Sequence, residues 1–208
     1  QGTPVRHQLR AVAMPSIVVE KKIIAVVLTG EFNPAIFHPA WLAQNELVAP
    51  EEAETVNEVI CTNEVSTFVL DGVHMQVERQ RFGLTTEDES KAVWLRDLTV
   101  GIFSILEHTP LKAIGFNQDI RYALDSEEMW HAIGDRLAPK PCWEGILESP
   151  GMLGVFMRGK RSDCAADRID IRVQPAPGLT NGVYVGFNQH YNLATESRFR
   201  CLIENKLR

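Results

Sequence analysis

Two stretches of alternating sequence carry the side chains best suited to chemistry. Leu111–Leu124 and Val183–Leu193 alternate polar and apolar residues, a pattern that predicts β-strands with one polar face each. If these strands are neighbours in one sheet, six polar side chains lie together: Asn117, Asp119, Arg121, Tyr184, Asn188 and His190. Gly115 and Gly186 on the same faces would let a ligand or a second backbone approach closely. This patch could bind a polar small molecule or a partner's loop. The usual behaviour of such faces favours the other interpretation, a solvated or dimer-buried face with satisfied cross-strand pairs.

An acid–base function would use His190 as a general base that Asp119 orients. The residue types are suitable, because histidine titrates near neutral pH and a carboxylate fixes its tautomer. This would indicate a hydrolase or nuclease-like enzyme. However, the sequence spacing does not support the pair, and no nucleophile lies in a recognisable elbow motif. We therefore favour a non-catalytic protein.

Known metal and cofactor motifs do not occur in the chain. The six histidines include no H-x-x-x-H or H-E-x-x-H pair, and metal binding needs three or four converging ligands. There is also no phosphate-binding G-x-x-x-x-G-K-[ST] motif and no G-x-G-x-x-G motif after a strand. The sequence therefore predicts neither a metal nor a cofactor, and we interpret His38, which precedes Pro39, as a helix cap.

The charge and hydropathy of the chain exclude several classes of partner. Its 208 residues carry a net charge of −6, which argues against a general nucleic-acid binder because such proteins have a basic stripe. RNA binding on the sheet is disfavoured as well, since the predicted polar face has few aromatic residues for base stacking. No apolar run approaches the roughly 18 residues that a membrane span requires. We expect no membrane association.

The cysteines indicate the redox compartment. Cys61, Cys142, Cys164 and Cys201 are widely spaced and form no C-x-x-C pair, so a zinc knuckle or a thioredoxin-type motif is excluded. Because the first residues do not read as a signal peptide, we expect reduced thiols and a cytoplasmic location. Residues 1–14 are expected to be a flexible arm or residues left from expression.

Caps and turns define the elements of the first half. Asp71-Gly72 is the strongest hairpin signal, because a type I′ turn needs positive φ at both central residues. A capping box at Thr86–Glu89 and an apolar stripe predict the longest helix, which Pro110 ends. The remaining expected elements are a strand at Ile23–Leu28, a short helix at Pro39–Leu47, a β-rich segment at Val56–Leu70 with a bulge at Asn63, and a returning strand from Val73.

The second half follows a similar order. After the strand at Leu111–Leu124, a capping box formed by Asp125 and Glu128 predicts a helix through Leu137. The expected elements after it are strands at Met152–Met157, Arg168–Gln174 and Val183–Leu193, a type I′ turn at Asn181-Gly182, and a helix at about Glu196–Lys206. Along Arg168–Gln174, the three apolar residues are expected to face inward.

The two halves repeat one plan. Gly72 and Gly182 are 110 positions apart, and Leu84 and Leu193 are 109 apart, a spacing typical of an internal duplication. Each half then reads β-α-β-β-α, and residues 23–124 follow the ferredoxin-like order. We predict an α+β fold in which duplicated, ferredoxin-like units share one antiparallel sheet with helices packed on one face. Residues 15–208 would form a single domain of two pseudo-repeats, about 20–110 and 111–208.

The function expected from this plan is binding rather than catalysis. A one-sided sheet with exposed edges favours a self-associating module, a homodimer or a subunit of a larger bacterial complex. The overall pattern is similar to that of uncharacterised bacterial proteins. The first alternative is a small-molecule sensor that binds a polar ligand on the open sheet face or between the repeats. The second is the hydrolase-type enzyme that would use Asp119 and His190.

Overall fold

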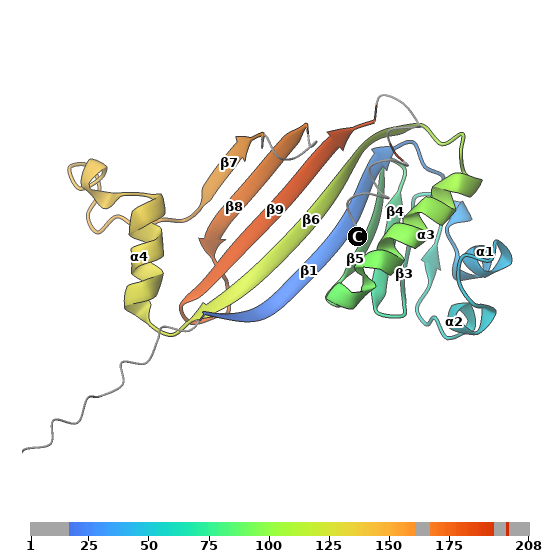
Figure 1. Cartoon of the computed structure of the whole chain (residues 1–208), viewed down its shortest axis with the longest axis horizontal. Helices are drawn as coiled ribbons and strands as arrows, with labels where there is room; N and C mark the ends of the chain where they lie inside the picture. Colours follow the sequence, from blue (N-terminus) through green and yellow to red (C-terminus); the bar gives the residue numbers. More distant parts are fainter. Residues whose placement is uncertain (1–16, 161–166, 194–198, 200–208) are drawn as a thin grey trace, which may run out of the picture.

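One nine-stranded antiparallel sheet organises the protein (Figure 1), whose computed structural model describes residues 17–160, 167–193 and 199. The strands lie in the order β2-β3-β4-β5-β1-β6-β9-β8-β7, and each described pair is antiparallel. Their bounds are β1 Ile17–Gly30, β2 Ile60–Cys61, β3 Val65–Leu70, β4 Val73–Glu78, β5 Arg81–Thr86, β6 Leu111–Leu124, β7 Val155–Gly159, β8 Arg168–Pro175 and β9 Gly182–Asn192. The α+β fold class and the antiparallel sheet are thus confirmed.

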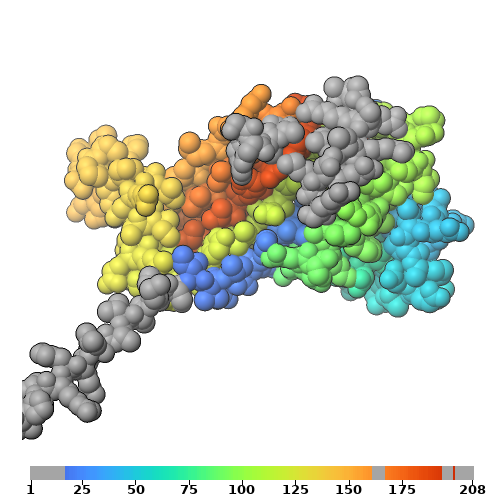
Figure 2. Space-filling view, in the orientation of Figure 1, coloured from blue at the N-terminus to red at the C-terminus, as the bar shows by residue number. Residues whose placement is uncertain are grey.

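Few helices accompany the sheet. The α-helices are α1 Pro39–Gln44, α2 Pro50–Glu54, α3 Ala92–Ile105 and α4 Glu127–Leu137, and the short 3₁₀ helices are η1 Pro34–Ile36, η2 Glu89–Lys91 and η3 Lys140–Cys142. The longest helix, α3, packs on the sheet face that carries the apolar core, whereas α4 projects beyond the opposite end of the sheet and has no fully buried residue (Figures 1 and 2). No described helix has the length and apolar character that crossing a membrane would require.

Strands β1 and β6 form the centre of the sheet. Each has 14 residues, and they pair along their whole length, from Ile17 opposite Leu124 to Gly30 opposite Leu111. The abundance of β-branched residues in β1 favours this extended conformation. Because β5 pairs with the outer side of β1 and β9 with the outer side of β6, the central pair joins the two halves of the chain.

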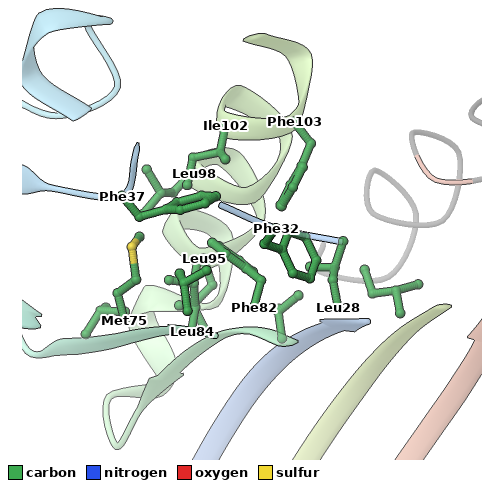
Figure 3. Packing of buried hydrophobic residues seen from close by; sticks show 14 of the residues in the cluster. Leu28, Phe32, Phe37, Met75, Phe82, Leu84, Leu95, Leu98, Ile102 and Phe103 are labelled. Atoms are coloured by element: carbon green, nitrogen blue, oxygen red, sulfur yellow. The ribbon is translucent and has the colours of Figure 1, made fainter. Parts of the chain in front are cut away.

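The apolar core lies between α3 and the face of the sheet that it covers. One lateral row of the core crosses four strands, with Phe82 opposite Leu28, Leu28 opposite Ile114 and Ile114 opposite Tyr191, and all four side chains are fully buried. Aromatic rings extend this row towards α3: the rings of Phe82 and Phe103 meet edge to face at a centroid distance of 5.1 Å (Figure 3). Edge-to-face pairs add about 0.5–1.5 kcal/mol to the burial of area.

Several local predictions are confirmed. His38 caps α1, with the backbone N–H of Ala40 donating to its Nδ1 at 3.1 Å. Asp71 and Gly72 connect β3 and β4 with φ values of 45° and 72°, as a type I′ turn requires. The strand predicted at Leu111–Leu124 has those bounds in the structure.

A strand that the sequence analysis did not predict changes the topology. Residues Arg81–Thr86 form β5, which turns back from β4 at Arg79-Gln80 and pairs with β1. The ferredoxin-like order would place β1 beside a strand parallel to it, but both neighbours of β1 are antiparallel. The ferredoxin-like duplication is therefore not confirmed. The segment Val56–Leu70 also differs, because a turn capped by the Thr62 hydroxyl divides it into β2 and β3, and Asn63 lies in that turn rather than in a bulge.

The predicted turn at Asn181-Gly182 is wrong. Strands β8 and β9 are joined by a loop at residues 176–181, in which Asn181 has φ 52° and Gly178 has φ 81°. Gly182 is instead the first residue of β9, where its N–H donates to Leu179 and its carbonyl accepts from Ala176. Two successive turns fill this loop, so the two-residue connection that the dipeptide suggests does not form.

The ends of several elements also differ from the predictions. Asp88, rather than Thr86, caps η2, and Ser126, rather than Asp125, caps α4 by accepting from the N–H of Met129. The strand expected at Met152–Met157 is β7, which begins three residues later. On β8 the expected inward alternation holds for Ile169, which is buried, but not for Ile171, which is exposed. The predicted arm at residues 1–14 and, apart from Phe199, the predicted C-terminal helix lie outside the described residues.

Candidate functional site

The two strands with the predicted polar patch are neighbours in the sheet. In the register of β6 with β9, Asn117 lies opposite Asn188 and Arg121 lies opposite Tyr184. Asp119 faces Gly186, and Gly115 faces His190. Since residues directly opposite each other project from the same face, all six predicted side chains share the face of the sheet that lies opposite the core. We call this the open face.

Hydrogen bonds connect the patch across the two strands. The Tyr184 hydroxyl donates to Oδ1 of Asp119 at 2.6 Å, and Nδ2 of Asn188 donates to Oδ1 of Asn117. A Cβ at Gly186 would lie 2.7 Å from the Tyr184 hydroxyl, and one at Gly115 would lie 3.1 Å from Nδ2 of Asn188. The two glycines therefore make room for the protein's own side chains to lie across the strands.

A hollow of about 600 Å³ opens on this face. It includes four of the six predicted residues: Asn117, Asp119, Tyr184 and Asn188. Arg121 and His190 belong to the same face but not to the lining of the hollow. The hollow forms because small residues such as Ala25 and Gly186 lie at its base, while longer side chains such as that of Arg81 line its sides.

The sequence analysis missed the walls of this hollow. They come from β5, β7 and β8, and include Arg81, Phe156, Arg158, Asp170 and Arg172. The alternation of Arg168–Gln174 had indicated an outward polar face, but it did not show that β8 would lie beside β9. That adjacency places Asp170 opposite Asn188 and Arg172 opposite Gly186.

Asp170 is held by two arginines on this wall. Nε and one terminal nitrogen of Arg158 donate to its two carboxylate oxygens at 2.7 and 3.1 Å, and Nε of Arg168 lies 3.1 Å from Oδ2. The hydrogen bonds from Arg158 lower the pKa of Asp170 against the opposing effect of burial, and the charges of both arginines add to the lowering. The carboxylate is therefore ionised at neutral pH, with guanidinium groups on both sides.

Arg172 lies against two aromatic rings. Its guanidinium carbon is 5.0 Å from the ring centroid of Phe156 and 5.7 Å from that of Tyr184, within the range of cation–π attraction. Its Nε donates to Oε1 of Gln174 at 2.7 Å. These contacts hold the guanidinium in one orientation at the side of the hollow.

Tyr184 acts as a neutral hydrogen-bond donor. Burial, followed by the hydrogen bond to Asp119, raises the pKa of Tyr184 to about 12. Removing its proton would place a phenolate beside the Asp119 carboxylate in a partly desolvated position. At neutral pH, Tyr184 therefore positions Asp119 and provides neither a nucleophile nor a base.

The structure does not bring Asp119 and His190 together. Asp119 lies opposite Gly186, which is four residues from His190 along β9, a separation of about 13 Å at the usual rise of a strand. The imidazole Nε2 of His190 is instead 3.2 Å from Oδ1 of Asn192. The geometry offers no support for the acid–base pair considered from the sequence.

A second cavity of about 690 Å³ lies between α4 and the chain that follows it. Trp130, Ile133, Leu147 and Met152 provide apolar walls, and an ion pair of 2.9 Å joins Asp135 and Lys140 at its side. Although this cavity is larger, fewer hydrogen-bonding side chains converge on it than on the open-face hollow. We regard the open-face hollow as the candidate site because convergent polar groups give a binding site its specificity.

Within the described ranges, no group of three or more histidine, cysteine, aspartate and glutamate side chains is arranged to hold a metal ion. The two described cysteines, Cys61 and Cys142, are free thiols. Comparison with known proteins adds no assignment, since the chain matches no protein-family model and no curated protein sequence.

Proposed function

We propose that this protein is a non-catalytic binding module that takes a polar small molecule in the open-face hollow. The observation that carries the proposal is the convergence of hydrogen-bonding side chains from several strands on one concave site: Arg81, Asn117, Asp119, Arg172, Tyr184 and Asn188. The volume of about 600 Å³ lies within the range of small-molecule sites in proteins. Small-molecule binding was the first alternative from the sequence, and the geometry favours it over the other expected functions.

The chemistry of the polar groups supports binding rather than catalysis. Asp170 is neutralised by arginines, and Asp119 accepts from a phenol that stays protonated at neutral pH. Groups held in this way orient a ligand but are not poised to take a proton from it. Apolar residues such as Ile23 and Val27 contribute to the floor, as expected for a site that desolvates part of its ligand.

We also propose that the two halves of the chain are structural repeats, with the hollow between them. Each half consists of a long strand, a helical segment and a series of antiparallel strands whose last member returns beside the long strand. The partner of β1 is β5 and the partner of β6 is β9. In the first half, the chain continues past the meander into α3. A single domain of two pseudo-repeats, about 20–110 and 111–208, follows from it.

The binding proposal is tested by thermal unfolding in the presence of a panel of small metabolites at millimolar concentration. A ligand that binds only the folded protein raises its melting temperature. We expect at least one polar metabolite to do so, and we expect Asn117→Ala and Asn188→Ala to weaken that effect. His74→Ala is the matched control, because His74 projects from the open face but does not line the hollow. No stabilisation by any metabolite, or an equal effect in all three variants, would contradict the proposal.

Self-association is a second candidate, which one edge of the sheet favours. Strand β7 pairs only with β8 among the described strands, and its Phe156 and Met157 side chains are 68% and 62% exposed. The opposite edge, β2, has only two residues. Exposed apolar edge strands readily pair with another chain. Two β7 strands paired antiparallel about Met157 would place Phe156 opposite Arg158 of the partner subunit, a favourable cation–π combination.

The oligomeric state in solution tests this second candidate. We expect the unmodified chain to sediment as a dimer and Met157→Lys to sediment as a monomer, because the added charge opposes edge pairing. Ile60→Lys on the short β2 edge is the control and should leave the dimer intact. A monomeric unmodified chain would contradict self-association and would leave the ligand proposal unaffected. The cytoplasmic location expected from the cysteines stays a prediction.

A further inference from the structure

The charges around the open-face hollow differ in sign from the charge of the protein. The chain has a net charge of −6, yet Arg81, Arg158 and Arg172 line the hollow against only two carboxylates, Asp119 and Asp170. Two more arginines, Arg121 and Arg168, project from the same face beside it. A concave site with this excess of guanidinium groups attracts anions.

The carboxylates of the hollow are already engaged by the protein. Asp170 accepts two hydrogen bonds from Arg158 and lies 3.1 Å from Arg168. Asp119 accepts from Tyr184, and the charges of Arg172 and Arg121 act on that phenol. A cationic ligand would therefore compete with Arg158 and Arg168 for Asp170 and with the Tyr184 hydroxyl for Asp119.

In contrast, Arg172 and Arg81 have side-chain N–H groups that donate no hydrogen bond among the described residues. Within that part of the chain, Arg172 donates through its Nε to Gln174, while its terminal nitrogens donate no hydrogen bond. Its contacts with the rings of Phe156 and Tyr184 hold the guanidinium plane in place, which reduces the entropy lost when a ligand binds. A guanidinium with free terminal nitrogens is suited to a carboxylate or phosphate, which it can bind through two parallel hydrogen bonds.

Arg81 provides a second cationic group on the opposite wall. Its guanidinium atoms lie within 3.6–3.7 Å of the position that a Cβ on Gly83 would take. The side chain therefore lies along the sheet beside the hollow rather than extending away from it. Within the described ranges, the Arg81 side chain forms no hydrogen bond and no ion pair.

The lining between these cations is partly apolar. Ile23, Val27 and Phe156, which project from the open face, contribute aliphatic and aromatic surface. This surface would exclude water around an apolar ligand body, and removing apolar surface from water favours binding. A small inorganic anion would leave it uncovered.

We propose that the open-face hollow binds an organic anion, in which a carboxylate or phosphate group pairs with Arg172 and an apolar body covers the floor of the hollow. The inference rests on the proposed small-molecule function and assigns its ligand class. Carboxylate and phosphate share the chemistry that the guanidinium recognises, and the experiment separates them.

Titration of the full chain with four matched six-carbon probes tests the ligand class: hexanoate, hexyl phosphate, hexylamine and hexanol, with inorganic phosphate as a fifth. We expect hexanoate or hexyl phosphate to bind at least tenfold more tightly than hexylamine, hexanol and inorganic phosphate. Whichever of the two anions binds more tightly identifies the head group. Tighter binding of hexylamine or hexanol would overturn the anion inference and leave the proposed small-molecule function standing. Absence of binding by all five probes would also overturn it, and the function would then depend on the metabolite panel alone.

Arginine variants show where the anion binds. Arg172→Gln should weaken the binding of the preferred anion at least tenfold, and Arg172→Lys should restore only part of it, because lysine keeps the charge but loses the planar pair of donors. Arg81→Gln provides a second, independent variant should the first fail to fold. Arg79→Gln is the control, since Arg79 forms an exposed ion pair with Glu64 away from the hollow. Equal affinity in all variants would overturn the assignment to this site.

Discussion

The hydroxyl of Tyr184 on β9 donates a hydrogen bond of 2.6 Å to Oδ1 of Asp119 on β6. The two residues are not directly opposite each other, because Tyr184 faces Arg121 and Asp119 faces Gly186. The bond therefore runs diagonally, through the space that Gly186 leaves free. This contact ties the two strands together at the open-face hollow, which both residues line.

The first prediction concerns the stability that this phenol provides. Tyr184→Phe should lower the free energy of unfolding by about 1 kcal/mol at pH 7, the usual net value of one partly exposed hydrogen bond. The pKa of Tyr184 is raised from 10.0 to about 12 in the folded protein, so the folded state holds the phenol proton more tightly than the unfolded state. The linked stabilisation is complete below pH 10 and is lost as the pH rises through about 12.

Urea unfolding of both proteins at pH 8, 10 and 11.5 measures this effect, and the difference between them should shrink over the series. Tyr122→Phe serves as the control, since the Tyr122 hydroxyl donates no hydrogen bond to any of the described residues. A difference between wild type and Tyr184→Phe that stays constant with pH would show that the phenol is not held by Asp119.

The second prediction concerns Asp170 and acid. Hydrogen bonds from Arg158 lower the pKa of Asp170 in the folded protein, so its contribution to stability is present above the ordinary aspartate pKa and is lost as the pH falls through the lowered value. Asp170→Asn should therefore be less stable than wild type at pH 7, and the two should converge towards pH 3. Thermal unfolding across this range gives the comparison.

Asp97→Asn is a suitable control for acid, because Asp97 forms an exposed pair with its neighbour Arg96 away from the hollow. It should follow wild type at each pH, since exposed pairs contribute little. An Asp170→Asn variant as stable as wild type at pH 7 would show that the ion pairs of Asp170 with Arg158 and Arg168 do not contribute to stability.

The third prediction concerns the buried row of the core. Phe82→Ala removes a fully buried ring that contacts Phe32, Phe37 and Phe103. The loss of contacts and the cavity left behind should cost about 3–5 kcal/mol of unfolding free energy. Val69→Ala, on the open face of β3 and 54% exposed, should cost less than about 1 kcal/mol. Equal costs in denaturant titrations would mean that α3 does not pack over β5.

The fourth prediction separates the two glycines that the sequence analysis treated alike. Gly72→Ala should destabilise the protein by about 1–2 kcal/mol, because Gly72 has φ 72° and a Cβ is disfavoured in that region. Gly182→Ala should destabilise it for a different reason, since the new Cβ would lie 2.5 Å from Cβ of Leu179.

Second substitutions at Leu179 test the steric explanation for Gly182→Ala. Leu179→Ala keeps the Cβ of Leu179, so it should not rescue Gly182→Ala, whereas Leu179→Gly removes that atom and should rescue it in part. Gly145→Ala, which would meet no atom within 4 Å, should leave stability unchanged. Denaturant midpoints provide the measurement, and full rescue of Gly182→Ala by Leu179→Ala would contradict the steric explanation.

Local signals in the sequence predicted those elements whose stability comes from neighbouring residues. His38 caps α1 because its ring accepts from the backbone N–H two residues later. Asp71 and Gly72 form a type I′ turn because both residues tolerate positive φ. The alternation along Leu111–Leu124 was sufficient to define β6 and its polar face. It also placed Asn117 and Asp119 on one side, since side chains on a strand alternate between the two faces of the sheet.

Contacts between distant residues decided the remaining features. Arg81–Thr86 is a strand because it pairs with β1 on one side and with β4 on the other. The residue types within these six positions do not predict that pairing. Asn181-Gly182 could not form a two-residue turn because the preceding residues folded into a longer loop. Asp119 and His190 were compatible in type, but the register of β6 with β9 separated them.

The sequence by itself determined the fold class, most strands and the polar character of one sheet face, because each depends on residue type and on a period of two or 3.6 residues. Only the tertiary structure determined the order of the strands, and this order brought Arg81, Phe156 and Arg172 around Asp119 and Tyr184. The physical reason is that strand pairing uses backbone hydrogen bonds, which are the same for every residue. The choice of neighbours therefore depends on how the whole chain buries its apolar surface.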